Sequence, residues 1–116
     1  MKSSIISRVL KSDEYFREYK FTVKINCSDY DKNIDDSLKE QKIIMQGAVD
    51  LSFAEGDKLV IVDYKTDRVK DINRLGELYS KQIYLYKNAM QQCTGLTVDE
   101  MYIYSLNLND FLPIKN

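Results

Sequence analysis

Two residues of opposite charge, Asp63 and Lys65, follow directly on the apolar run of residues 59–62. Residues two apart in a strand share a face, so both side chains should point to the same side of a sheet. A carboxylate and an amine at the end of a buried strand cost free energy unless they pair with each other or bind a ligand. The spacing therefore indicates either a ligand site or an ion pair that closes a strand end.

A second carboxylate, Asp50, ends the segment GAVD (residues 47–50) upstream of that pair. If the chain turns near Gly56, Asp50 lies across from the neighbourhood of Asp63. Two carboxylates on adjacent strands repel each other unless a cation lies between them. Mg²⁺ prefers one or two carboxylates together with water and phosphate oxygens, so the pair is a candidate magnesium site. The alternative is that Asp50 is a solvated aspartate at a sheet edge.

A third polar residue, Gln82, falls on the apolar side of a predicted helix, and Tyr86 follows one turn later on the same side. A glutamine in that position costs free energy unless its amide has a defined partner. Because this helix follows the strand that carries Asp63 and Lys65, Gln82 is placed to hydrogen-bond near the carboxylates or to a substrate. The alternative is a glutamine on the helix surface that borders the core.

Periodic apolar residues predict the elements that position these side chains. The predicted order is helix 4–12, strand 19–27, strand 43–53, strand 59–65, helix 74–93 and strand 100–106. The segment 28–41 is polar and is predicted to be a loop. The apolar side of the long helix consists of Leu75, Leu78, Tyr79, Gln82, Leu85, Tyr86, Ala89, Met90 and Cys93, and Gly95 is expected to end it.

The connections between these elements predict the sheet. A short turn around Gly56 predicts an antiparallel hairpin, and a helix between the last two strands predicts a parallel crossover. Residues 1–116 are therefore predicted to form one α/β domain with a mixed sheet and the order helix, three strands, helix, strand.

Composition excludes several classes of protein. The 116 residues are 44% hydrophobic and 30% charged, which suits a domain with one core. The chain has no histidine, and Cys27 and Cys93 lack CxxC spacing, so a His-ligated zinc site is excluded and two reduced thiols are expected. No apolar stretch reaches the length of a membrane span, and no signal peptide opens the chain, so a cytoplasmic location is expected.

Three motifs resemble those of the PD-(D/E)XK nucleases. They are GAVD (residues 47–50), VDYKTD (residues 62–67) and QIYLY (residues 82–86). Within that superfamily they are most similar to the RecB-like branch, and within the branch to the C-terminal nuclease domains of the A subunits of ATP-dependent helicase/nucleases. Arg17-Glu18, ahead of the first strand, adds to the likeness, which covers roughly residues 4–106.

The resemblance implies a restriction-endonuclease-like fold and an exodeoxyribonuclease that hydrolyses DNA phosphodiester bonds with Mg²⁺, for which Mn²⁺ is expected to substitute. It implies that the chain is a fragment of a larger helicase–nuclease polypeptide that processes double-strand breaks for recombination. The partners would be DNA, the helicase domains of the same polypeptide and a second, AddB-like subunit. The chain has no GxxxxGK[ST] motif, so an ATP-driven motor would lie outside it.

The resemblance also assigns roles to single residues. Asp50 and Asp63 would bind the metal, and Lys65 would orient or activate the attacking water and stabilise charge in the transition state. Gln82 and Tyr86 would position the substrate or support the site. Glu18 matches a glutamate that recurs before the first strand and would have a supporting role.

Two departures leave alternatives open. Family members usually add a metal ligand, often His or Glu, from a helix upstream of the first strand, and this chain offers only Glu14 and Glu18 there. Its net charge of −1 also differs from the basic excess of proteins that hold DNA alone. One alternative is a catalytically silent module of the same fold that binds DNA or a partner protein. The other is a small scaffold domain whose charged pairs are only structural.

Overall fold

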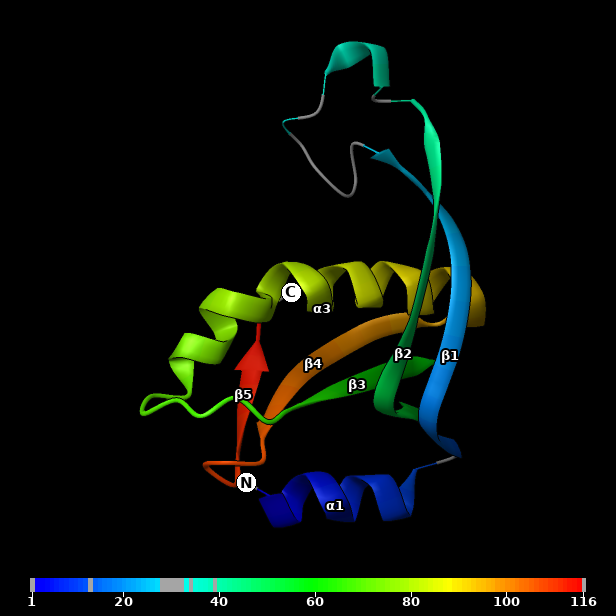
Figure 1. The fold of residues 1–116 in the computed structure, drawn as a ribbon. Coiled ribbons are helices and arrows are strands. Elements are labelled where there is room, and N and C mark those ends of the chain that lie inside the picture. Colours follow the sequence, from blue (N-terminus) through cyan, green and yellow to red (C-terminus); the bar gives the residue numbers. More distant parts are fainter. Residues whose placement is uncertain (1, 13, 28–32, 34, 39, 116) are drawn as a thin grey trace.

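A five-stranded mixed sheet lies between two helices in the computed structural model (Figure 1). The structure describes residues 2–12, 14–27, 33, 35–38 and 40–115. The elements are α1 (Lys2–Lys11), β1 (Glu14–Asn26), η1 (Asp36–Leu38), β2 (Lys42–Glu55), β3 (Lys58–Lys65), α3 (Asn73–Thr94), β4 (Thr97–Ser105) and β5 (Asp110–Ile114). The strand order β1-β2-β3-β4-β5 fits the expected restriction-endonuclease-like core.

The connections agree with the sequence prediction. β2 and β3 form an antiparallel hairpin whose turn contains Gly56 with a φ of 63°, a conformation that glycine adopts without strain. β3 and β4 are parallel and α3 crosses between them. α3 ends at Gly95, which has a φ of 75° and donates its N–H to the carbonyl of Gln91.

Two strand predictions were incomplete. β5 was not predicted, because Pro113 counts against a strand. The proline is tolerated because β5 is an edge strand, and no strand on its outer side needs the missing N–H. β1 begins at Glu14, whereas the prediction began at Tyr19. The first five residues of β1 are all exposed, so no alternation of apolar and polar residues marked them as a strand. Within the predicted loop 28–41, the structure shows η1, while residues 28–32, 34 and 39 lie outside the described residues.

Each face of the sheet has its own hydrophobic cluster. The larger cluster lies under α3 and includes Leu75, Ile83, Ala89 and Met90 of that helix. The smaller cluster lies under α1 and consists of Ile5, Phe53 and Val60, with Val9, Tyr102 and Phe111 packed around it.

The predicted apolar stripe of α3 was partly wrong. Leu78 is 47% exposed and Cys93 is also exposed, whereas Ile83, outside the stripe, is 1% exposed. The helix is thus turned slightly from the predicted orientation. Both cysteines are free thiols, as expected. Neither helix in the described part of the chain is long and apolar enough to cross a membrane.

Arg8 fixes α1 to the sheet. Its guanidinium contacts Glu55 of β2 at 2.6 Å and Glu100 of β4 at 2.5 Å. These charge-assisted hydrogen bonds hold the pKa of both carboxyls below the usual range. The ion pairs therefore set the position of α1 across β2, β3 and β4.

The sheet forks where β2 leaves β3. Val49 packs in the cluster under α3, whereas Phe53 packs in the cluster under α1. Two residues separated by an even number of positions share a face in a regular strand, so β2 must turn over between Val49 and Phe53. Pairing of β2 with β3 stops at Leu51↔Val62, and beyond that point the β1–β2 hairpin rises away from the sheet (Figure 1).

Candidate active site

The two predicted metal ligands lie at this fork. Since the last β2–β3 pair is Leu51↔Val62, Asp50 and Asp63 are the next residues as the strands separate. The Asp50 Oδ2 atom accepts a hydrogen bond of 2.8 Å from the backbone N–H of Tyr64. The carboxylate of Asp50 thus gives the β3 backbone an acceptor at the point where the β2 backbone no longer pairs with it. The fork brings both carboxylates together, as the hairpin prediction required.

Asp63 is buried, with 6% of its surface exposed. Burial raises the pKa of its carboxyl to about 6, and a hydrogen bond to Asp50 acts in the same direction, while Lys65 opposes both effects. When both aspartates are ionised, two negative charges face the single positive charge of Lys65. This imbalance favours either a proton or a cation between the carboxylates.

Lys65 is held on three sides. Its Nζ atom lies 3.0 Å from Asp63 Oδ2, donates a hydrogen bond of 2.6 Å to Gln82 Oε1 and lies 4.1 Å from the centre of the Tyr79 ring. The ring adds a cation–π contact. Gln82 therefore has the defined partner that its position on the helix requires. Because its amide oxygen binds Lys65, its amide nitrogen remains a donor for another group.

Tyr86 lies on the same side of the sheet as Asp63. Burial raises the pKa of its hydroxyl, and the charges of Asp63 and Asp50 raise it further. Its ring meets the edge of the Phe21 ring at a centroid distance of 5.4 Å. A Cβ atom at Gly47 would lie 2.7 Å from Phe21 Cζ and 3.2 Å from Tyr86 Cε1. The glycine of the GAVD motif therefore leaves room for these two rings.

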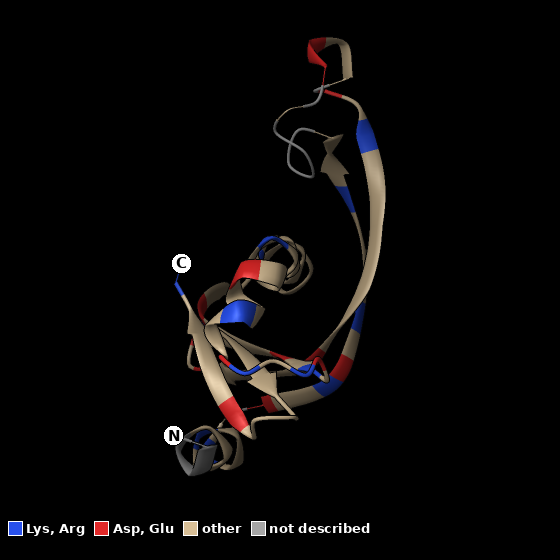
Figure 2. Cartoon of the chain, turned by 60° about the vertical axis from the view of Figure 1, so that its left-hand side comes forward, with Lys and Arg blue, Asp and Glu red and all other residues tan. Residues whose placement is uncertain are grey.

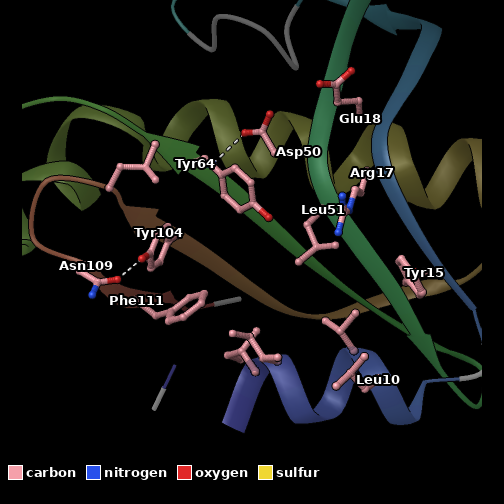
Figure 3. A pocket seen from close by; sticks show the side chains of 14 residues that line it. Leu10, Tyr15, Arg17, Glu18, Asp50, Leu51, Tyr64, Tyr104, Asn109 and Phe111 are labelled. Carbon is pink, nitrogen blue, oxygen red and sulfur yellow. Dashed lines mark hydrogen bonds between the residues drawn. The ribbon is translucent and has the colours of Figure 1, made fainter. Parts of the chain in front are cut away.

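Glu18 lies opposite Asp50 but contributes to a different space. The pairs Arg17↔Leu51 and Tyr19↔Val49 place it across from Asp50, and its φ of 51° is unusual for a residue other than glycine. Its side chain is exposed and lines a cavity on the α1 side together with Asp50 (Figure 3). Asp50 thus stands between that cavity and the buried Asp63–Lys65 pair.

Sequence reasoning missed two residues of the site. Tyr79 was predicted only as part of the apolar stripe, and Asp67 was read only as part of a motif. In the structure, the Tyr79 hydroxyl donates a hydrogen bond of 2.8 Å to Asp67 Oδ2, which fixes the ring against Lys65. A usable signal was present, since Tyr79 lies one turn before Gln82 on the same helix face.

The oxygen donors at the fork suit a hard divalent cation. Mg²⁺ is commonly held by one or two carboxylates, with water and phosphate completing its shell. Burial of Asp63 and its closeness to Asp50 also mean that a cation would relieve an existing repulsion. The described residues contain no group of three or more His, Cys, Asp or Glu side chains placed to hold a metal. Within that part of the chain, Asp50 and Asp63 are the two carboxylates that meet at the fork.

Several known proteins are similar in sequence to this chain over nearly its full length. It is 35% identical over 116 residues, or 98% of the chain, to the A subunit of the ATP-dependent helicase/nuclease of Clostridium acetobutylicum. It is 37% identical over 114 residues to the same subunit of Clostridium kluyveri and 33% identical over 114 residues to that of Clostridium botulinum strain 657. The chain is homologous to a segment of these helicase/nuclease A subunits.

The homology has clear bounds. The chain spans 9% of the length of each of these A-subunit relatives. No protein-family model matches it. The expected likeness to helicase/nuclease A subunits is thus confirmed, and the activity of the segment that they share with this chain is a separate question.

Proposed function

We propose that the chain is a metal-dependent DNA nuclease domain that hydrolyses phosphodiester bonds with Mg²⁺ held by Asp50 and Asp63. The observation that carries the proposal is the meeting of these carboxylates at the fork, with Lys65 fixed beside them by Asp63 and Gln82. A plain ion pair at a strand end needs neither the second carboxylate nor the glutamine. The word nuclease in the names of the relatives supports the same reading.

Each residue then has a defined task. Asp50 and Asp63 bind the cation, which when bound supplies Lewis-acid polarisation of the phosphodiester and a more acidic water. Lys65 orients the attacking water and offsets the negative charge that develops on the phosphate oxygens. Gln82 holds the amine of Lys65 in place and keeps its own amide N–H₂ group for the substrate. Tyr86 excludes water from the buried side of Asp63.

We further propose that the domain works as a part of an ATP-dependent helicase/nuclease. The relatives carry that name, and the chain matches only a small segment of them. Helicase domains of the same polypeptide and a second, AddB-like subunit would then deliver the DNA during double-strand break processing. Exonucleolytic cutting and a PD-(D/E)XK mechanism belong to the same proposal.

The test is cleavage of end-labelled linear DNA with Mg²⁺ or Mn²⁺. Lys65→Ala should lower the cleavage rate by roughly 10²–10³-fold, the effect of losing one preorganised charge donor. Lys70→Ala, which removes an exposed lysine between β3 and α3, should cut like the parent. Circular dichroism of each variant checks that the fold is intact. Equal rates for the parent and Lys65→Ala would show that the assignment is wrong.

A second candidate is a catalytically silent module of the same fold. It is favoured by the finding that no three metal-binding side chains converge within the described part of the chain. Such a module would bind DNA or a partner protein without turnover. Binding of DNA by the parent without cleavage, under either metal, would establish this function in place of the first.

A further inference from the structure

A cavity of about 800 Å³ lies between α1 and the sheet, on the face opposite α3 (Figure 3). Residues of β1 and β2 form one wall of the cavity. Residues of β4, of β5 and of the loop between them form the other wall. Ile6 and Leu10 of α1 line it and remain 58% and 77% exposed. Large exposed apolar side chains gathered in one place mark a binding surface.

The cavity is charged at one end and apolar at the other. Arg17, Glu18 and Asp50 lie at the end formed by β1 and β2. The opposite end is lined by Tyr104 and Phe111, and Figure 3 shows Tyr64 between the two ends. Asp50 connects this space to the proposed metal site, because its carboxylate also meets that of Asp63.

The aromatic end is already ordered. The rings of Tyr64 and Tyr104 meet edge to face at 6.0 Å, and those of Tyr104 and Phe111 are tilted at 4.7 Å. The Tyr104 hydroxyl donates a hydrogen bond to the amide oxygen of Asn109, which fixes the ring. The remaining Asn109 N–H₂ group is a donor beside the rings, suited to the edge of a base.

We propose that this cavity binds an unstacked nucleobase of the DNA strand whose phosphate lies at Asp50. A nucleotide joins a charged phosphate to a flat, largely apolar base. The cavity likewise joins a charged end, where Arg17 and a cation at Asp50 would face the phosphate, to an aromatic end. Stacking of a base on an aromatic side chain stabilises single-stranded complexes in a way that tolerates any sequence. An apolar peptide would fill the aromatic end and leave the charged end of the cavity empty. The inference rests on the proposed function, since it takes the phosphate position from the metal site.

Binding of modified oligonucleotides tests the inference without relying on cleavage. The probe is a short fluorescein-labelled oligothymidylate, compared with the same strand carrying abasic sugars, with Ca²⁺ in place of Mg²⁺. Removing the bases keeps the phosphates, so a base-binding cavity predicts a dissociation constant roughly five- to hundredfold higher for the abasic strand. Equal affinity for the two strands, or no binding of the intact strand, would overturn the inference.

Substitutions locate the effect. Tyr104→Leu should weaken binding of the intact strand and leave binding of the abasic strand unchanged. Tyr104→Phe keeps the ring but loses its hydrogen bond to Asn109, so it should bind the intact strand more tightly than Tyr104→Leu does. Tyr84→Leu, on the exposed side of α3, is the matched control and should bind like the parent. If Tyr104→Leu does not fold, the abasic comparison on the parent decides alone.

The outcome is separable from that of the nuclease proposal. Cleavage with Mg²⁺ by a protein that binds intact and abasic strands equally would overturn only the nucleobase site. Base-dependent binding by a protein that never cleaves would overturn only the nuclease. Assembly into a dimer that Tyr104→Leu dissociates would assign the cavity to a second copy of the chain and overturn the inference.

Discussion

The ionisable carboxyl of Asp63 is buried, with 6% of the residue's surface exposed. Its pKa rises from 3.8 to about 6, chiefly through burial and then through the hydrogen bond to Asp50. Between about pH 4 and pH 6, the folded chain therefore holds a proton on this carboxyl that the unfolded chain has already released. Stability from this group is present below about pH 4 and is lost as the pH rises to about 6.

Removing the charge should reverse this loss. In the metal-free protein, Asp63→Asn should be more stable than the parent at pH 8, by at most about 3 kcal/mol, because the ion pair with Lys65 is lost at the same time. At pH 4 the difference should shrink towards zero or change sign. Denaturant unfolding with a chelator present measures both values. Asp57→Asn, in the exposed β2–β3 turn, is the control, and a difference between Asp63→Asn and the parent that does not change with pH would contradict the account.

At this scale the sequence singled out the polar residues that the structure brings together and missed the aromatic one. Asp50, Asp63, Lys65 and Gln82 stand out because each is polar in an apolar run, where only a partner or a ligand offsets its burial. Tyr79 does not stand out, because an aromatic residue on an apolar helix face is equally well explained by core packing. Its contact with Lys65 depends on the position of α3 over β3, which no local pattern encodes.

The fork is the element-scale feature that the sequence did not reveal. Apolar residues stand at alternate positions from Ile43 to Phe53, interrupted only by Gly47, which predicts one regular strand with a single buried face. In the structure the two halves of that pattern face different helices. The reversal occurs at Asp50 and at Glu18 opposite it, whose positive φ marks the bend in β1. Tertiary packing against two helices therefore determines which face of the sheet each apolar residue of β2 occupies, and sequence periodicity alone does not predict it.

The glycine of GAVD tests how tightly the hairpin packs on α3. Gly47→Ala places a methyl group 2.7 Å from Phe21 Cζ, so the ring must move and take the support of Tyr86 with it. We expect a loss of roughly 1–3 kcal/mol in the free energy of unfolding, the usual cost of overpacking. Denaturant titration measures it.

A second substitution serves as the control for this packing. Phe21→Leu removes the ring that the new methyl group would meet. The double variant Gly47→Ala/Phe21→Leu should therefore lose less stability than the sum of the two single changes. Strict additivity would mean that the methyl group is accommodated elsewhere and that the glycine is not required for ring packing.

The whole molecule carries little net charge compared with proteins that hold DNA by themselves. Lysine and arginine number 17 and aspartate and glutamate 18, and Figure 2 shows the two kinds interspersed along the chain. A nuclease domain of this charge would depend on other parts of a larger protein to hold the DNA backbone. Such dependence agrees with a chain that spans 9% of its helicase/nuclease relatives. The isolated chain should then bind DNA weakly and through its site rather than through a basic surface.

The central claim is that Asp50 and Asp63 together hold one divalent cation, and the most direct test is Mn²⁺ titration followed by electron paramagnetic resonance. The parent should bind one Mn²⁺ ion per chain, Mg²⁺ should displace it, and affinity should fall below about pH 6 as a proton competes for Asp63. Asp63→Asn should abolish this binding, while Lys65→Ala should retain it. Absence of binding in the parent, or equal binding in the parent and Asp63→Asn, would contradict the account.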